Sequence, residues 1–125
     1  MIQFGICNEI FKDWSLDDKF QFAAKVGYDA VEIAPFTIAK HVTDISATRR
    51  SQIREAAARS GIAISGIHWV LVQTEGMYVT HPDAAVRKRT SDYFGELAKF
   101  CAEIGEKTIV VGSPKQRNVK GKRKR

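Results

Sequence analysis

Polar side chains stand where the apolar segments of this 125-residue chain end. A carboxylate, Glu32, alternates with apolar neighbours, and an imidazole, His68, closes the next apolar segment. Asn8 follows the opening segment, and Lys115 lies in the loop after the last one. Groups of these types can hold a polar ligand through hydrogen bonds and charge. They therefore occupy the positions that the rim of an active site would need.

Glu32 and His68 each have a structural alternative. Glu32 points to the opposite face from its apolar neighbours, which would be the mouth of a barrel or the solvent side of an open sheet. Because buried acids are rare unless paired or functional, we favour a role in a pocket. His68 is either a core imidazole bonded to a carbonyl or a group that faces a substrate or metal. His41 and His81 fall in predicted loops or helix starts, where a solvated side chain is the default.

These residues are positioned by a repeated order of helix, glycine and apolar strand. The repeat occurs at residues 26–33, 60–67 and 104–111, after an opening strand at residues 2–7. The glycine supplies a left-handed cap that returns the chain toward the sheet. The alternation predicts a parallel β-α-β-α-β-α-β sheet with right-handed crossovers. In such folds the loops after the strands build the site.

Three segments supply the predicted helices. The first should span about residues 16–26, after the capping pair Ser15 and Asp18. The third starts at residues 80–83, with Pro82 in a first turn that has no amide partner to lose. The second starts near Ser46 and is expected to carry its four arginines outward: Arg49, Arg50, Arg54 and Arg59.

The net charge of +6 is concentrated at the carboxyl terminus. Residues 1–119 carry 15 basic and 14 acidic side chains, a net of +1. We predict one domain over residues 1–119 and a disordered basic tail at residues 120–125. The tail could contact phosphates or act as a nuclear localisation signal. Alternatively, it is a solvated end of the chain or the product of a truncated or shifted reading frame. No aromatic residue interrupts it, so nucleic-acid binding is not indicated.

Targeting and cysteine signals are sparse. No apolar run is long enough to cross a membrane, and the chain opens in strand pattern rather than in a secretory signal. We therefore expect a cytoplasmic protein with reduced thiols at Cys7 and Cys101. Neither has Cys-x-x-Cys spacing or a histidine nearby in sequence, so we assign them no metal or redox role.

Four segments in order carry a family resemblance: residues 4–9, residues 27–33, the pair His68-Trp69 and residues 112–118. Together they resemble the sugar phosphate isomerase/epimerase family, whose fold is the xylose isomerase-like TIM barrel. The resemblance covers residues 2 to about 119. It implies an α/β fold that is the N-terminal half of a (β/α)8 barrel, with four parallel strands and three intervening helices.

The resemblance implies an enzyme that moves a proton next to a ketose carbonyl, acting on a sugar or sugar phosphate. It also implies a divalent metal, Mn²⁺ or Mg²⁺ rather than Zn²⁺, with paired carboxylates that move the proton. In the family those ligands and glutamates come mainly from strands five to eight, which this chain lacks. We therefore carry over Glu32, His68, Asn8 and Lys115 as substrate-binding candidates and assign no catalytic residue and no metal ligand.

Alternatives to an active isomerase remain. Such a half-barrel is expected to be inactive alone and to self-associate through open edges at its first and fourth strands. The chain could instead be a non-catalytic remnant or a binding module that engages an acidic partner through its basic tail. The endonuclease four type of DNA repair hydrolase gathers several histidines around zinc. This chain has three histidines, one of them at a strand end, so that hypothesis is weaker.

Overall fold

The computed structural model describes residues 1–119, and the basic tail predicted at residues 120–125 lies outside them. One parallel sheet with the order β1-β2-β3-β4 organises the chain. The predicted alternation of four parallel strands and three intervening helices is confirmed. The strands are β1 (Gly5–Cys7), β2 (Ala30–Ile33), β3 (Ala63–His68) and β4 (Ile109–Val110).

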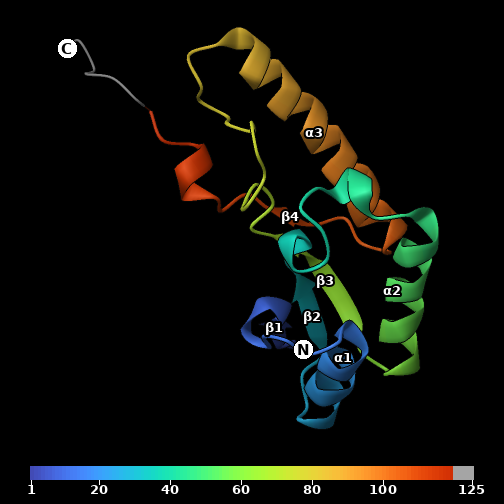
Figure 1. Cartoon of the computed structure of the whole chain (residues 1–125). Helices are drawn as coiled ribbons and strands as arrows, with labels where there is room; N and C mark the ends of the chain where they lie inside the picture. Colours follow the sequence, from blue (N-terminus) through green and yellow to red (C-terminus); the bar gives the residue numbers. More distant parts are fainter. Residues whose placement is uncertain (120–125) are drawn as a thin grey trace.

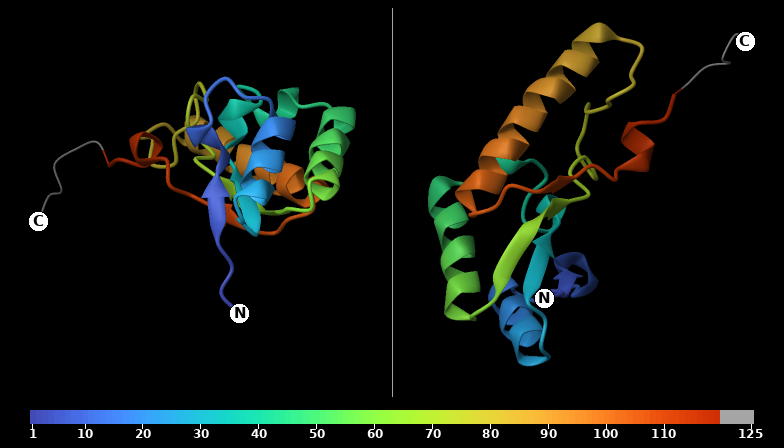
Figure 2. Two further views of the ribbon diagram at one scale, coloured as in Figure 1. Left: turned by 90° about the horizontal axis from the view of Figure 1, so that it is seen from below. Right: turned by 180° about the vertical axis from the view of Figure 1, so that it is seen from behind.

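Three α-helices follow the first three strands. Each is preceded by an N-cap residue whose side chain accepts a hydrogen bond from a backbone N–H of the first turn. The figures show them on one side of the sheet, with α3 the longest (Figure 1, Figure 2). Asp83 caps α3, so Pro82 precedes the cap and does not lie in the first turn as predicted. The helices are α1 (Leu16–Lys25), α2 (Ala47–Arg59) and α3 (Ala84–Glu103). None of the helices within residues 1–119 combines the length and apolar character that a membrane span requires.

Four short 3-10 turns, which the sequence pattern did not predict, follow strands or connect elements. A turn directly after a strand fixes the direction in which the next side chains project, so these turns shape the carboxyl edge of the sheet. Their bounds are η1 (Asn8–Ile10), η2 (Pro35–Thr37), η3 (Val42–Asp44) and η4 (Pro114–Gln116).

The hydrophobic core lies between the sheet and the helices. In β2 the side chains of Val31 and Ile33 are fully buried, whereas Glu32 between them is partly exposed. Because successive side chains of a strand point to opposite faces, Glu32 lies on the face away from the helices. Phe20 of α1 and Phe100 of α3 are fully buried in the same core. The apolar face of β2 therefore packs against the helices, and its other face can present polar side chains to a ligand.

Arg50 corrects the prediction that all arginines of α2 point outward. Its side chain is 7% exposed and donates hydrogen bonds to the carbonyls of Val42 and Ile45. It also forms an ion pair with Glu103 at the end of α3 and lies over the ring of Phe100. A guanidinium can be buried when its donors are satisfied in this way. Arg50 thus connects α2 to α3 and to the η3 turn.

Gly66 allows the close approach of β3 to the chain before β4. Its φ is +143°, and a β-carbon there would lie 2.5 Å from the carbonyl oxygen of Thr108. The pairing between β2 and β3 also shifts register between Val31 and Glu32, so that Glu32 pairs with Gly66. Such an irregularity re-aims the side chains that follow it. The register shift lies in the pairing of β3, the strand that ends in His68.

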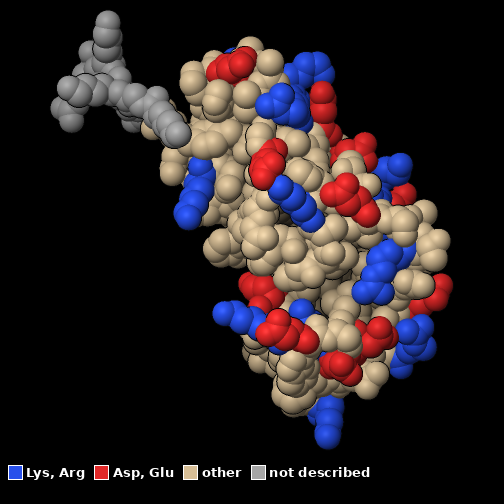
Figure 3. All heavy atoms as spheres, in the orientation of Figure 1, with Lys and Arg blue, Asp and Glu red and all other residues tan. Residues whose placement is uncertain are grey.

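The surface carries both signs of charge. On the face in Figure 3, basic and acidic side chains of the described residues alternate, and no large patch of one sign is visible there. This distribution agrees with the net charge of +1 over residues 1–119. It gives no support to a nucleic-acid groove on that face, because such grooves are lined by clustered Lys and Arg.

Candidate functional site

Three ionisable side chains converge at the carboxyl ends of neighbouring strands. Cys7 ends β1 and pairs with Glu32 of β2, and His68 ends β3. Glu32 in turn pairs with Gly66, and His68, two residues farther along, lies on the same face of the sheet. The ligand atoms of Cys7, Glu32 and His68 lie within 4.8 Å of one another. We call these three residues together with Glu9 the strand-end cluster.

His68 is the centre of the strand-end cluster. Its side chain is 5% exposed, and its Nε2 lies 2.9 Å from a carboxylate oxygen of Glu9 in the turn after β1. Its Nδ1 lies 3.3 Å from Oε2 of Glu32. This buried nitrogen has no hydrogen-bond partner. The structure therefore places this imidazole against two carboxylates rather than against a backbone carbonyl.

Cys7 adds a thiol to the cluster. Its Sγ lies 3.7 Å from Oε2 of Glu32, to which the thiol donates a hydrogen bond. Burial, together with the negative charges of Glu9 and Glu32, raises the pKa of Cys7 to about 11. The thiol is therefore protonated at neutral pH when no cation is present. No sequence signal marks Cys7 as part of a site, because its histidine neighbour is far away along the chain.

Asn8 and Lys115, the other two substrate-binding candidates, lie differently. Asn8 is fully buried, and its amide accepts from the backbone N–H of Ala34 and donates to Oγ1 of Thr37, each at 2.8 Å. Lys115 lies exposed in the η4 turn after β4. Within residues 1–119 no hydrogen bond or ion pair joins either side chain to Glu32 or His68. The structure thus brings together two of the four candidates.

A hollow of about 720 Å³ opens beside the strand-end cluster. Glu9 and the buried Lys19 line it together with the aromatic side chains of Trp14 and Phe36. Burial lowers the pKa of Lys19, and the nearby carboxylates of Glu9 and Asp13 oppose that effect. An aromatic wall with a few polar groups is typical of a small-molecule site.

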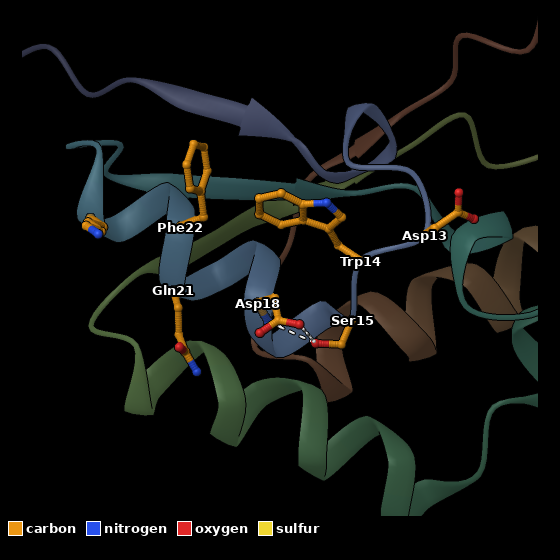
Figure 4. Close-up of a pocket in the computed structure, with 7 residues that line it drawn as sticks. Asp13, Trp14, Ser15, Asp18, Gln21 and Phe22 are labelled. Atoms are coloured by element: carbon orange, nitrogen blue, oxygen red, sulfur yellow. Dashed lines mark hydrogen bonds between the residues drawn. The ribbon is translucent and has the colours of Figure 1, made fainter.

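Trp14 also borders a second hollow at the start of α1. This hollow has a volume of about 490 Å³, and Figure 4 shows Trp14 and Phe22 extending on the same side of α1. Phe11, Trp14 and Phe22 form an aromatic group with ring centroids 5.4 to 5.6 Å apart. Ser15 and Asp18, which also line this hollow, are occupied in capping the helix. The hollow therefore offers mainly apolar surface.

The remaining histidines lie away from the cluster. His41 contacts Asp44 and the ring of Tyr93, and His81 accepts a hydrogen bond from the backbone of Asp83. Neither joins His68 in the described part of the chain. The structure thus shows no gathering of histidines within residues 1–119 of the kind that the hydrolase hypothesis requires.

The donor set of the cluster does not suit the metal that the resemblance implies. Mg²⁺ and Mn²⁺ prefer carboxylate, carbonyl and water oxygens, whereas thiolate and imidazole suit Zn²⁺ and other borderline or soft ions. Only one of the three converging donors is an oxygen atom. Within residues 1–119 no other group of three Cys, His, Asp or Glu side chains converges in the same way. We therefore derive no chemical step through Mn²⁺ or Mg²⁺ from these residues.

A comparison with family models matches residues 20–125 to the model described as xylose isomerase-like TIM barrel. The chain belongs to this family. The match confirms the family resemblance, and with it the strands and helices are a partial TIM barrel of the xylose isomerase-like fold. In such barrels the loops at the carboxyl ends of the strands carry the active site. The strand-end cluster occupies that end of the sheet.

Solved structures share this fold. A D-psicose 3-epimerase crystallised with D-fructose superposes with a TM-score of 0.70 at 23% identity. A D-psicose 3-epimerase from Clostridium cellulolyticum H10 with D-tagatose gives 0.69 at 18% identity, and a fusion of a xylose isomerase-like TIM barrel with a 4-hydroxyphenylpyruvate dioxygenase gives 0.63 at 20% identity. At these identities the likeness shows the fold.

The coverage of these matches is unequal. Each alignment covers 88% of this chain, but only 37% of either epimerase and 16% of the fusion protein. This chain therefore spans well under half the length of the epimerases it resembles. A comparison with functionally curated proteins found no match.

Proposed function

We propose that the chain contributes the substrate-binding wall of a sugar or sugar phosphate isomerase or epimerase, which moves a proton next to a ketose carbonyl. The observation that carries the proposal is the convergence of Glu32 and His68 at the carboxyl ends of adjacent strands. Family membership and the fold shared with two D-psicose 3-epimerases support it. We place the protein in carbohydrate metabolism and in the cytoplasm.

The described residues would bind and orient the sugar. The carboxylates of Glu9 and Glu32 can accept hydrogen bonds from sugar hydroxyls, because each is about one quarter exposed. His68 would keep Glu9 in place through their hydrogen bond. Trp14 and Phe36 would cover the apolar face of a sugar ring in the adjacent hollow. Lys115 and Asn8 remain candidates for contacts with the substrate.

Full activity would require more than these residues. The Mn²⁺ or Mg²⁺ that the resemblance implies and the groups that transfer the proton would lie outside the described residues. A second part of the barrel, supplied by the same protein, a partner or another copy, would complete the site. The chain alone is therefore expected to bind the sugar without turning it over.

The test combines ketose binding with proton exchange. Ligand-observed NMR would measure the binding of D-fructose, D-tagatose, D-psicose and their phosphates, with and without Mn²⁺. The same samples in deuterated water would report deuterium uptake next to the carbonyl. Glu32→Gln should weaken binding by about tenfold, which corresponds to about 1.4 kcal/mol for one charged hydrogen bond. Glu55→Gln, a matched change at an exposed position of α2, should leave binding unchanged.

Each outcome has a distinct meaning. Binding that depends on Glu32, with or without exchange, supports the proposed wall. Exchange by the chain alone would further show that its own residues suffice for catalysis. If neither ketoses nor ketose phosphates bind, or if both variants bind equally well, the proposal is wrong. In that case the alternative of a non-catalytic remnant or binding module would stand.

A further inference from the structure

We propose that Cys7, Glu32 and His68 form a binding site for a borderline-soft divalent cation of the Zn²⁺ type, with Glu9 as the residue that orients His68. This site is distinct from the oxygen-rich metal site that the family resemblance implies. It uses Cys7, which neither the sequence pattern nor the resemblance assigns to any role. It shares Glu32 with the proposed sugar-binding wall, but it does not rest on the proposed function, because its test measures metal binding in the absence of a sugar.

The spacing of the donor atoms fits tetrahedral coordination. Zinc bonds of about 2.3 Å to sulfur and about 2.0 to 2.2 Å to nitrogen and oxygen place tetrahedral S and O ligands about 3.6 Å apart, and N and O ligands about 3.4 Å apart. The corresponding distances are 3.7 Å between Sγ of Cys7 and Oε2 of Glu32, and 3.3 Å between Nδ1 of His68 and the same oxygen. The third edge, from Sγ to a ring nitrogen of His68, is within 4.8 Å. Rotation of the Cys7 side chain toward His68 would bring this third edge toward the tetrahedral value.

The unpartnered nitrogen of His68 is the second, independent observation. Glu9 is an acceptor, so Nε2 of His68 carries the proton of their 2.9 Å hydrogen bond. In the neutral ring Nδ1 then carries a lone pair 3.3 Å from the carboxylate of Glu32, and no hydrogen bond satisfies this buried atom. Two acceptors this close repel one another, and a buried acceptor without a partner is costly. A cation between them would satisfy both.

Glu9 provides the outer support that metal-bound histidines usually have. A carboxylate that accepts the second ring N–H fixes the tautomer and orientation of the imidazole and makes it a stronger ligand. The Glu9–His68 hydrogen bond has this arrangement, and the residues come from the turn after β1 and the end of β3. The side chain of Glu32 is 25% exposed, so water can reach the cluster and take the fourth position. The site is thus supported from within the sheet and open toward solvent.

The donor set predicts the selectivity of the site. One thiolate, one imidazole and one carboxylate match Zn²⁺ and Co²⁺, whereas Mg²⁺ requires a shell of oxygen atoms. Metal binding would displace the thiol proton of Cys7 to solvent and form a metal–sulfur bond, with no oxidation or reduction. That bond supplies a spectroscopic signature that an exposed carboxylate pair cannot give.

The experiment uses the purified full chain with Co²⁺ and Zn²⁺, and with Mg²⁺ for comparison. Co²⁺ titration should produce a thiolate-to-cobalt charge-transfer band in the near-ultraviolet with one ion per chain, and Zn²⁺ should abolish that band by displacement. Cys7→Ser should remove the band, whereas Cys101→Ser, a matched change at the buried cysteine of α3, should retain it. Glu9→Gln should retain the band but weaken Zn²⁺ binding by about 10- to 100-fold. His68→Gln should weaken Zn²⁺ binding more than Glu9→Gln does.

Several results would overturn the inference. One is a folded wild-type chain, verified by circular dichroism, that gives no charge-transfer band with Co²⁺. Others are a band that persists in Cys7→Ser, or Mg²⁺ binding as tight as Zn²⁺ binding. The first result would indicate that His68 lies between the two carboxylates without binding a metal. If His68→Gln does not fold, Cys7→Ser and Glu9→Gln still decide the question, because both replace a side chain by one of nearly equal size.

Discussion

Asn8 links the end of β1 to the turn that follows β2. Its amide accepts from the N–H of Ala34 and donates to the hydroxyl of Thr37, which itself donates to the carbonyl of Ala34. Without this bond the buried N–H of Ala34 and the buried amide of Asn8 would lie in the interior with unsatisfied polar atoms. The side chain therefore holds η2, and with it Phe36 at the wall of the hollow.

Replacing this amide separates a structural role from substrate binding. Asn8→Ala should lower the free energy of unfolding by about 1–3 kcal/mol, because the buried N–H of Ala34 loses its acceptor. Urea denaturation followed by circular dichroism would measure the change. Asn118→Ala, which removes the same amide from an exposed position, is the matched control and should have little effect. Unchanged stability together with weaker ketose binding would instead show that Asn8 acts on the substrate directly.

At the scale of elements, the end of β3 depends on Gly66. The shifted register against β2 and the approach to Thr108 both occur at this residue. The N–H of the following residue, Ile67, donates to the carbonyl of Thr108, which is the same oxygen that a β-carbon at position 66 would meet. A side chain here would push β4 away from β3 and move His68 relative to Glu32.

Gly66→Ala should therefore destabilise the sheet by about 1–3 kcal/mol, since alanine is strained at φ +143° and its β-carbon collides with backbone. Gly95→Ala is the matched control within α3, where a β-carbon would meet no atom within 4 Å. It should stabilise the helix by about 0.5–1 kcal/mol, because glycine is a poor helix former. Thermal and urea unfolding of both variants would check the contrast. Equal effects of the two substitutions would show that the β3–β4 contact does not constrain Gly66.

The elements themselves were predictable from sequence, because their signals are local. Glycines after helices, strand alternation around Glu32 and the serine caps at Ser15 and Ser46 all act over a few residues. The site was only partly predictable, because its contacts join distant residues. Glu9 and His68 are 59 residues apart along the chain. The buried Arg50 forms its ion pair with Glu103, which is 53 residues away. Nothing in the local sequence of Cys7 or Arg50 distinguishes them from an inert thiol or a solvated arginine.

At the scale of the whole molecule, the sheet has two edges within the described residues, at β1 and β4. Apolar side chains are exposed at both. Phe4, beside β1, is 66% exposed, and Val111, beside β4, is 46% exposed. Open edges with apolar side chains favour pairing with another chain. Two four-stranded sheets together have the eight strands of a closed barrel.

We therefore predict that the chain self-associates in pairs, with β4 of each copy against β1 of the other. Sedimentation velocity over a range of concentrations should show a dimer for the unchanged chain. Phe4→Lys and Val111→Lys should each shift it toward monomer, because a charged edge resists strand pairing. Gln52→Lys, which adds the same charge on the exposed surface of α2, should leave the dimer intact. A monomer that melts cooperatively would contradict the prediction.

Mixing the two edge variants tests whether β4 of one copy meets β1 of the other. In a mixed pair, the unaltered β1 of Val111→Lys can meet the unaltered β4 of Phe4→Lys, so one of the two contacts is restored, whereas a pair of identical variants restores neither. The mixture should therefore sediment closer to the dimer than either variant does alone at the same total concentration. If β1 instead pairs with β1, Val111→Lys would remain dimeric alone, and mixing would restore nothing to Phe4→Lys. The pattern of rescue thus reports which edges meet, because each edge carries its own substitution.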